Sequence, residues 1–404
     1  MKVVFVGSVL PDDVFFNISN VSPSTNNVQL NYISILFRKY KNDLHVFSCN
    51  LNLKKIDSLN INHTISSCIF KLNNGPTIKT ISFDSSRKLM NLSLIRNLKK
   101  EIGDLRNRFK KERFLFIINN HFYFHTLPVF SKKKKRDLVI TILNEALDIR
   151  YIPDHGKPTL KDRVVNFVNF KLLRRNSGLI SFSQSSITDY HLDSIPHIVL
   201  VHPPSAFFPP RTNVDKKSFV MFYGGLINRI YGINSILDAM SILPERFKLI
   251  LCGGGDKELI ESIIDKSKED SRIKYLGLVP KKTALEYEAN SNLLLMIRPL
   301  ETLSDKYIAR YSQPSKISEY LQSKVPILAT IIEGIPLEIR PFISFVVDDD
   351  PKKIDSNVIE IEKKYSEYIE KAEAGFEYLN SHCSLTALEE RFLDFIDKVS
   401  NLEK

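Results

Sequence analysis

The chain has 404 residues, 43% of them hydrophobic and 25% charged, so it can bury a large core and we expect two domains. Mean hydropathy is −0.13, and no apolar run approaches the roughly 18 residues that a membrane-spanning helix needs. The net charge of +11 is uneven. Residues 1–210 carry 30 Lys and Arg against 15 Asp and Glu, whereas the rest carries 27 against 31. This asymmetry indicates that the first half faces an anionic partner.

Three anionic partners are considered: nucleic acid, anionic lipid and a phosphate-bearing acceptor. Basic residues cluster at Lys99–Lys100, Arg106–Arg113 and Lys132–Arg136, and the last cluster follows the aromatic-rich run His121–Phe130. Cationic and aromatic groups side by side are typical of a membrane surface, although a solvated helix face explains the charges equally well. No RNP sequence or zinc spacing accompanies the charge, so nucleic acid ranks last.

The first apolar segment, Met1–Gly7, resembles a signal peptide only superficially, because it is short and Pro11 follows without a small-residue cleavage site. We expect a first buried strand there. The four cysteines are scattered, with neither a CxxC motif nor metal-like spacing, and are interpreted as small buried hydrophobic residues. The expected location is a reducing cytoplasm.

Short β-rich runs alternate with helical patterns through the first half of the chain, which is typical of parallel sheets covered by helices. Helices are predicted at about Asn27–Tyr40 and Arg87–Lys111. The predicted strands are Val3–Gly7, Leu44–Ser48, Phe114–Asn119, Leu138–Leu143, Leu179–Phe182 and Ile198–Val201.

The proline-rich segment His202–Pro210 predicts an extended linker, because residues that precede proline avoid the helical region. The alternation then restarts. Helices are predicted at Ile233–Leu243, Asp256–Lys266 and Lys281–Asn290, and a terminal helical pattern runs over Cys383–Leu402. The predicted strands are Ser218–Tyr223, Phe247–Cys252, Ile273–Gly277, Asn292–Ile297, Val325–Thr330 and Ile343–Val347.

These patterns predict an α/β chain with two doubly wound, Rossmann-like domains and a ligand cleft beyond the carboxyl ends of the strands. The expected boundaries are 1–205 for the first domain, 206–382 for the second, and 383–404 for a terminal helix. That helix either crosses back onto the first domain or is an ordinary packed terminal helix.

The segment Ile297–Thr330 is the most informative part of the chain. Pro314 is expected in the first turn of a helix between two apolar strands, where proline is sterically pre-set. The free N–H groups behind it, with the Ser312 and Ser315 hydroxyls and the Lys316 ammonium, predict a diphosphate site. Glu319, one turn later, is within reach of ribose or sugar hydroxyls.

Several ordered pieces carry a resemblance to a known family. They are Tyr223-Gly224-Gly225-Leu226 with Tyr231-Gly232, Leu251–Asp256, Tyr275–Pro280, and Pro314–Leu321 before Val325–Leu328. In this order and spacing, the second half resembles the C-terminal domain of GT-B-fold retaining glycosyltransferases, the group that builds bacterial polysaccharides and glycolipids (glycosyltransferase family 4-like). The match extends more loosely to the first half.

The resemblance implies a nucleotide-sugar donor site in the second half and an acceptor site in the first. Catalytic roles are expected for His121, Arg229, Arg298 and Lys316. The expected donor-binding residues are Gly224, Gly225, Gly253, Val279, Ser312, Ser315, Ile317 and Glu319. No cofactor is expected, since the UDP- or GDP-linked sugar is itself the substrate, and GT-B sites work without a metal.

The chain departs from the family pattern at three positions. Arg is usual where Gly225 stands, Lys where Tyr231 stands, and Glu where Tyr311 stands. Arg229 and Arg298 are candidates for the missing cation. The Gly253–Gly255 run lacks the spacing of a phosphate loop and is interpreted as a tight turn before an N-cap at Asp256. Asp348–Asp350 is interpreted as an acidic turn.

The expected reaction is transfer of a hexose-type sugar from a nucleotide donor to a polysaccharide or lipid-linked saccharide at the inner membrane face, with retention implied by the resemblance. Fixed positive charge would stabilise the departing diphosphate. No carboxylate pair is placed for a glycosidase. Two alternatives stay open: a nucleotide-sugar epimerase of the same fold, and a non-catalytic glycosyltransferase-like binding partner.

Overall fold

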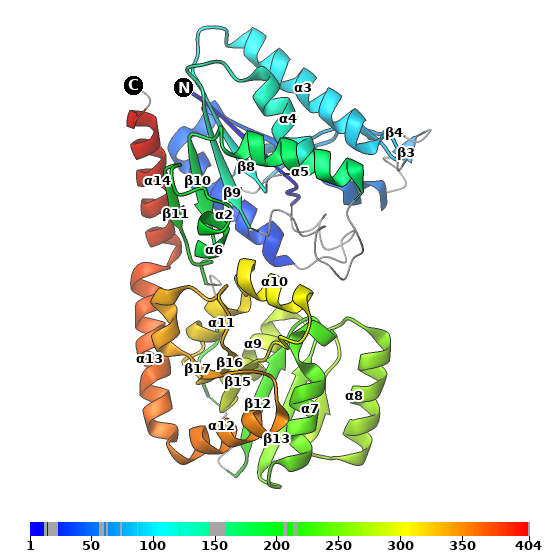
Figure 1. Cartoon of the computed structure of the whole chain (residues 1–404), viewed down its shortest axis with the longest axis vertical. Helices are drawn as coiled ribbons and strands as arrows, with labels where there is room; N and C mark the ends of the chain where they lie inside the picture. The colour runs from blue at the N-terminus through cyan, green and yellow to red at the C-terminus, as the bar shows by residue number, and fades with distance from the viewer. Residues whose placement is uncertain are drawn as a thin grey trace. The chain divides into compact units, whose positions relative to one another are not determined.

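The protein is described from a computed structural model (Figure 1). It covers residues 1–11, 14, 23–55, 60–61, 64–72, 75–86, 88–120, 122–144, 159–204, 208–212 and 217–402. The chain divides into two compact units. Unit 1 contains Met1–Tyr151, His155–Leu200 and Leu388–Lys404, and unit 2 is mainly Val201–Ala387.

Unit 1 is built on an eight-stranded sheet with strand order β11-β10-β9-β8-β1-β2-β6-β5, in which all neighbours are parallel except β5 and β6. Its strands are β1 (Lys2–Gly7), β2 (Leu44–Ser48), β5 (Ile69–Lys71), β6 (Thr77–Thr80), β8 (Phe114–Asn119), β9 (Leu138–Leu143), β10 (Gly178–Ser181) and β11 (His197–Val199). A small antiparallel sheet contains β3 (Asn60–Ile61), β4 (Thr64–Ile65) and β7 (Phe83–Asp84).

Among the described residues, six α-helices accompany the strands of unit 1. They are α2 (Pro23–Tyr40), α3 (Met90–Arg108), α4 (Tyr123–Lys132), α5 (Leu160–Leu173), α6 (Gln184–Thr188) and α14 (Leu385–Leu402), with short 3-10 helices at Lys41–Asp43 and Leu51–Lys55. In α3 the buried residues Leu94, Leu98, Ile102 and Leu105 recur every three or four positions. They form one stripe that joins the core over β1 and β8.

The C-terminal helix α14 belongs to unit 1 from Leu388 onward. The Phe392 ring lies 4.7 Å from the Tyr32 ring of α2, and both side chains are buried. Arg391 also donates a hydrogen bond to the carbonyl oxygen of Val199, at 3.0 Å. The helix therefore covers strands that are formed two hundred residues earlier in the chain.

Part of the basic sequence in unit 1 is structural. Arg106 and Asp137 form a buried ion pair, and Asp137 is fully buried. The same carboxylate accepts a hydrogen bond from the Phe114 N–H at 3.0 Å, which ties it to the first residue of β8. Arg106 therefore stabilises the core and does not belong to a solvent-facing basic cluster.

Unit 2 has a six-stranded, fully parallel sheet with the order β14-β13-β12-β15-β16-β17. Its strands are β12 (Phe219–Gly224), β13 (Phe247–Cys252), β14 (Ile273–Tyr275), β15 (Leu293–Met296), β16 (Ile327–Thr330) and β17 (Ser344–Val346). Its helices are α7 (Ile233–Ile242), α8 (Lys257–Glu269), α9 (Lys281–Ala289), α10 (Leu303–Tyr311), α11 (Lys316–Gln322), α12 (Pro351–Lys363) and α13 (Tyr365–His382), with 3-10 helices at Arg229–Tyr231 and Leu337–Phe342.

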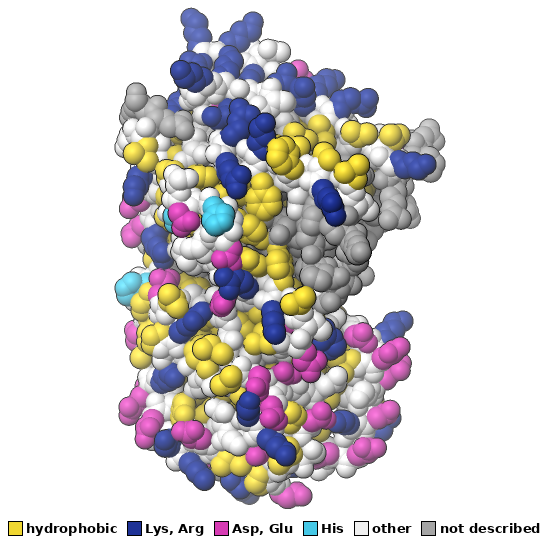
Figure 2. Space-filling model, viewed as in Figure 1, with side chains coloured by type: hydrophobic (Ala, Val, Ile, Leu, Met, Phe, Trp, Pro, Cys, Tyr) yellow, Lys and Arg dark blue, Asp and Glu magenta, His cyan; other side chains and the backbone are white. Residues whose placement is uncertain are grey.

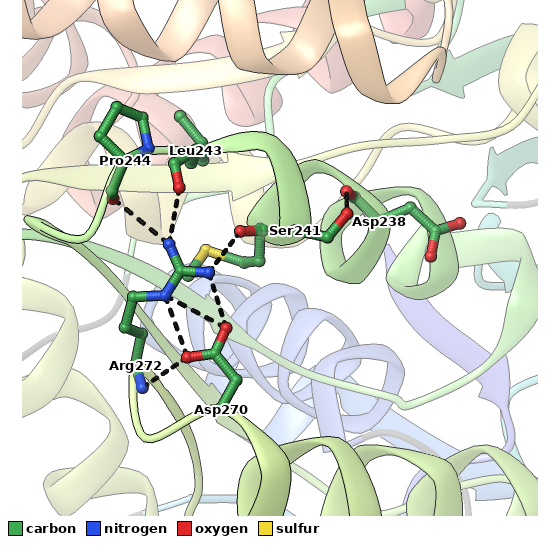
Figure 3. Close-up of polar contacts among 7 residues, drawn as sticks. Asp238, Ser241, Leu243, Pro244, Asp270 and Arg272 are labelled. Atoms are coloured by element: carbon green, nitrogen blue, oxygen red, sulfur yellow. Dashed lines mark hydrogen bonds and ion pairs between the residues drawn. The ribbon is translucent and has the colours of Figure 1, made fainter.

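The end of α7 is fixed by one arginine at the start of β14 (Figure 3). The Arg272 guanidinium donates to the carbonyl oxygens of Leu243 and Met240, at 2.6 and 2.8 Å, and pairs with Asp270 at 2.7 Å. Carbonyl groups in the last turn of a helix have no intrahelical donors, so the guanidinium supplies them. This contact joins α7 to the β13–β14 layer.

Every strand that the sequence predicts overlaps a strand of the structure, which confirms an α/β fold with parallel sheets. Figure 2 also shows the charge asymmetry: Lys and Arg gather on the surface around α3 and α4, while acidic side chains are more frequent around α7 and α8. In the described part of the chain, no helix is both long and apolar enough to cross a membrane.

Candidate functional site

The strand order of unit 2 reverses direction at one point of the sheet, between β12 and β15. From β12 the chain moves outward to β13 and β14, then returns to β15 on the other side of β12 and continues to β16 and β17. The loops that follow β12 and β15 therefore leave the carboxyl ends of these two strands in opposite directions. In doubly wound sheets a ligand binds at such a switch point, because the diverging loops leave room there.

The turn after β12 is Gly224-Gly225, and Lys316 lies against it. A Cβ atom built on Gly225 would come 2.6 Å from Cε of Lys316, so the absence of a side chain gives the lysine its place. The Gly224 N–H points to the Tyr320 hydroxyl, at 3.5 Å. Among the described residues no carboxylate forms an ion pair with Lys316. The lysine therefore brings a cation to the switch point.

Arg298 lies just beyond the end of β15 and is buried, with 9% of its surface exposed. Its N–H donates to Oγ1 of Thr330 at the end of β16, at 2.9 Å, and its guanidinium lies 4.5 Å from the centre of the Tyr231 ring. Its Nε atom has no hydrogen-bond partner within the described residues. A buried guanidinium donor without an acceptor is costly, which favours an anionic ligand at this position.

Arg229 has a different environment. Its guanidinium forms two hydrogen bonds with the Asp305 carboxylate, at 3.1 and 3.2 Å. That carboxylate also accepts from Thr302 in the capping box at the start of α10. The structure thus places Arg229 at the rim of the switch point, where it joins the Arg229–Tyr231 turn to α10. Its charge is shared with Asp305, unlike that of Lys316.

Gly253, in the turn after β13, packs against the backbone of the Gly225 turn. A Cβ on Gly253 would lie 1.7 Å from the carbonyl oxygen of Gly225, so only glycine lets the two turns approach this closely. The Gly253 N–H donates to the carbonyl of Gly277, at 2.9 Å. In the next turn, Asp256 accepts from the Leu259 N–H and caps α8, as its sequence position predicts.

Pro314 was predicted in the first turn of a helix, but it lies two residues before the helix begins. Helix α11 begins at Lys316, and Ser315 precedes it without a side-chain capping bond. The Ile317 side chain is fully buried, and its N–H donates to the Pro314 carbonyl at 3.0 Å. Ser312 is the C-cap of α10, where its N–H donates to Ile308. Lys316 is therefore the first residue of the helix.

Two further predicted donor residues lie on the flanks of this arrangement. Glu319, on α11, forms an ion pair with Lys281 of α9 at 2.9 Å. Val279, in the loop before α9, is partly buried against the apolar cluster that contains Ile317. Glu319 thus joins the two helices, and the carboxylate is three-quarters buried.

Sequence reasoning missed Glu288, which lies on α9 and is only 2% exposed. Burial raises the pKa of its carboxyl to about 8, and the nearby Lys316 charge acts in the opposite direction. One signal could have identified it. With Leu285 and Ala289, Glu288 occupies the buried face of the helix, where a charged residue is unusual.

In unit 1 the equivalent switch point lies between β1 and β8, because the chain leaves β1 for β2 and later returns to β8. Amide side chains gather there. Gln29 accepts from the Ser8 N–H at 2.9 Å, and Asn144 donates to Asn119 at 2.9 Å. A Cβ on Gly7 would lie 2.3 Å from Oε1 of Gln29.

Two histidines follow the end of β8 in sequence. His121 lies outside the described residues. His125, the third residue of α4, is fully buried, and its ring packs against Phe122 and Phe124 with centroids 5.6 and 4.6 Å away. The backbone of residues 23–25 opens α2, and Ser22 before it is outside the described residues.

Metal ligands do not gather anywhere in the described residues: no group of three or more His, Cys, Asp or Glu side chains is arranged to hold an ion. Asp348 and Asp350 form other contacts. Asp348 pairs with Lys353, and Asp350 caps α12 through the Lys352 N–H. The acidic turn predicted at Asp348–Asp350 thus precedes a helix.

No family model matches the sequence, and no curated protein matches it. Solved structures do match over nearly the whole chain. HepE from Anabaena, solved in complex with UDP, has a TM-score of 0.68 at 13% identity, over 98% of this chain and all of that one. Sucrose-phosphate synthase from Thermosynechococcus elongatus has a TM-score of 0.65 at 12% identity, over 99% of both chains. Trehalose 6-phosphate synthase from Burkholderia multivorans has a TM-score of 0.66 at 9% identity, with both chains fully covered.

The chain has the GT-B fold. At these identities the likeness establishes the fold of a glycosyltransferase and leaves the reaction to be argued from the residues. Within that fold, unit 2 holds Lys316 and Arg298 at its switch point, and unit 1 holds an amide-lined one.

Proposed function

We propose that this protein is a glycosyltransferase that binds a nucleotide-sugar at the switch point of unit 2. One observation supports this most directly. Lys316, which forms no ion pair with a carboxylate of the described residues, lies against the side-chain-free Gly225 turn at the carboxyl end of β12. Arg298 adds a buried guanidinium at the end of the neighbouring strand β15. Two cations at diverging strand ends suit a diphosphate, and the similar HepE structure was solved with UDP and with UDP-glucose.

The proposed chemistry follows from the charge that develops in the reaction. When the bond between the sugar carbon and the diphosphate oxygen breaks, the electron pair stays on the diphosphate. The acceptor hydroxyl forms the new carbon–oxygen bond and releases its proton. Lys316 and Arg298 would stabilise the growing phosphate charge, and fixed cations of this kind contribute most where water is excluded. Family 4-like character, retention of the sugar configuration and hexose transfer rest on the sequence resemblance, and UDP is favoured over GDP by the HepE complexes.

The other predicted donor residues have supporting roles in this proposal. Gly224, Gly225 and Gly253 keep the turn free of side chains so that a phosphate can reach the backbone. Ser312 and Ser315 lie close to Lys316 in sequence, and Ile317 anchors the helix in the core. Glu319 would accept hydrogen bonds from the ribose hydroxyls in place of its ion pair with Lys281. Val279 and the neighbouring loop would lie against the nucleobase.

We further propose an oligosaccharide or lipid-linked acceptor at the switch point of unit 1. The amide side chains of Gln29, Asn119 and Asn144 are donors and acceptors without charge, which suits sugar hydroxyls. His121, next to the end of β8 in sequence, would contact the donor sugar, as the resemblance implies. The proposed location is the inner face of a cell membrane, with capsule or O-antigen-type polysaccharide as the product class.

Helix α5 supports the membrane contact. Leu160, Val164 and Phe167 lie on one side of this helix and are 80%, 55% and 68% exposed, and the exposed Arg163 and Lys171 flank them. An exposed apolar stripe beside cations is typical of a helix that lies in a lipid interface. Flotation with vesicles of anionic phospholipid tests this contact. We expect Phe167→Ser to weaken binding, whereas Leu402→Ser, a similarly exposed residue of α14, should not.

The donor site is tested by calorimetric binding of UDP, GDP, ADP and CMP, and of their sugars, to the purified chain without metal. We expect one nucleoside diphosphate to bind and Lys316→Ala to lower turnover by about a hundredfold or more. Lys352→Ala, on the exposed face of α12, is the matched control. Binding by none of them would refute the donor site.

Analysis of the products formed from the nucleotide-sugar that binds separates the alternatives. A glycosyltransferase releases free nucleoside diphosphate only as the sugar is transferred to an acceptor or to water. An epimerase would return a changed nucleotide-sugar with no release of the diphosphate. A non-catalytic binding partner would bind without any turnover.

A further inference from the structure

The carboxyl group of Glu288 is an unusual feature of the unit 2 interior. Its side chain is carried by α9, which packs against β12, and it is 2% exposed. Its Oε1 atom has no hydrogen-bond partner among the described residues. A buried carboxylate without donors is strongly disfavoured, so the group must be neutral or must depend on a nearby cation.

The charged and titratable groups around Glu288 come from three elements. Lys316, Glu319 and Tyr320 are on α11, Cys252 ends β13, and Lys281 is on α9 itself. Lys281 already forms an ion pair with Glu319, at 2.9 Å. Tyr320 is fully buried and its hydroxyl is directed to the Leu295 carbonyl, at 3.4 Å, and the buried Cys252 thiol has a raised pKa. Lys316 and Lys281 both lower the pKa of Glu288, and the Lys316 charge has the larger effect.

Lys316 therefore acts on two groups, one by direct packing and one through its charge. On one side is the Gly225 turn, against which its Cε packs. On the other is the Glu288 carboxyl, whose pKa burial raises to about 8 while the Lys316 charge lowers it. A diphosphate bound at the turn would draw the ammonium charge and add negative charge of its own. Both effects make the ionised form of Glu288 less favourable.

We propose that the buried Glu288 carboxyl is coupled through charge to the Lys316 ammonium at the Gly225 turn and takes up a proton when a nucleoside diphosphate binds there. The inference rests on the proposed donor site. The proton comes from the solvent, adds to the Glu288 carboxylate and breaks no other bond. Donor affinity is then linked to pH through a residue that touches neither the sugar nor the phosphate.

The linkage fixes the direction of the pH effect. Below pH 8 Glu288 is already protonated, so binding requires no proton and affinity is flat. Above pH 8 a proton must be taken up, and affinity falls by up to about tenfold per pH unit. A glutamine at this position mimics the neutral acid and keeps a similar shape.

The test is calorimetric titration of UDP into the full chain at pH 7 to 9, in pairs of buffers that differ in ionisation enthalpy. We expect proton uptake at pH 8.5 that Glu288→Gln abolishes, together with an affinity that no longer depends on pH in that variant. Glu286→Gln, an exposed carboxylate on the same helix, is the matched control and should behave like the wild type. Equal proton uptake in the wild type and Glu288→Gln would overturn the inference while the donor site stands.

A second measurement needs no donor. Carbon-detected NMR of the free protein should show the Glu288 carboxyl titrating near pH 8, with a higher midpoint in Lys316→Met. Titration near the ordinary range of a glutamate, or a midpoint that ignores Lys316→Met, would overturn the inference even if no nucleotide binds. If no nucleotide binds but the Glu288 carboxyl titrates near pH 8 as expected, the proposed function is refuted instead.

Discussion

Lys316 packs its Cε against the backbone of Gly225, at a distance of 2.6 Å from where a Cβ on that glycine would lie. The family that the sequence resembles usually has arginine where Gly225 stands. Here the space is filled by a cation from α11, which begins at Lys316. The positive charge at the turn is thus supplied from another element, and its place depends on the glycine.

This relationship predicts the effect of Gly225→Ala. The new Cβ would meet the flexible end of a lysine, so the lysine moves, and the φ of +159° at Gly225 adds backbone strain that should lower the thermal midpoint. Loss of one charge-assisted contact of about 1.5–3 kcal/mol should weaken nucleoside diphosphate binding by roughly ten- to a hundredfold. Isothermal titration measures this effect.

A double-mutant cycle provides the control. If Gly225→Ala acts by displacing Lys316, it should add nothing to Lys316→Ala. Additive losses in the double variant would mean that the glycine acts on the ligand directly.

The glycine run after β13 predicts a contrast within three residues. Gly253→Ala should lower the free energy of unfolding by at least about 2 kcal/mol, because its Cβ would lie 1.7 Å from the rigid Gly225 carbonyl oxygen and its φ is +136°. Gly254→Ala should be tolerated, since the nearest atom to its Cβ is a leucine methyl at 4.0 Å. Denaturant unfolding of both variants checks this. A similar loss in both would show that the turn, and not the contact, is sensitive.

Parallel strands were the most predictable part of the fold. Runs such as Phe114–Asn119 and Phe247–Cys252 are mostly apolar and β-rich, and each forms a strand with the predicted bounds. Helix α5 was not predicted. Its sequence, LKDRVVNFVNFKLL, leaves apolar residues exposed on one side, so its pattern is not that of a core-facing helix.

The candidate site was predictable where a local motif determines it, and less so where the fold brings distant residues together. Lys316 and Gly225 were both named from sequence, but nothing in their local patterns showed that they touch. Arg229 was expected to supply a cation, yet Asp305, which is 76 residues away, pairs with it. Burial of Glu288 likewise depends on α11 and β12, which α9 meets only in the folded chain.

Glu288 also predicts how the stability of the chain changes with pH. Its pKa is about 8 in the folded chain against an ordinary value of 4.5, so the folded state binds the extra proton between these values. Folding stability therefore falls as the pH rises from about 4.5 to 8, and is constant on either side. The loss is of the order of 5 kcal/mol.

The Glu288→Gln variant isolates this contribution. Its stability relative to the wild type should increase steadily between pH 5 and 8, as measured by urea unfolding. A constant difference over that interval would mean that the carboxyl is ionised in the folded chain.

The last prediction concerns the end of α7. Arg272 donates to the carbonyl oxygens of Met240 and Leu243 and pairs with Asp270, so one planar guanidinium serves a helix end and a carboxylate together (Figure 3). Arg272→Ala should lower the free energy of unfolding by about 2–4 kcal/mol, because it removes several charge-assisted hydrogen bonds.

Arg272→Lys separates charge from geometry. A lysine retains the charge but cannot span both carbonyl groups and the carboxylate, so we expect it to recover less than half of the loss. Since Arg272 lies outside the donor site, nucleotide affinity at low temperature should match the wild type in both variants. Full rescue by lysine would show that the positive charge alone stabilises this end of α7, and that the fork geometry of the arginine contributes nothing.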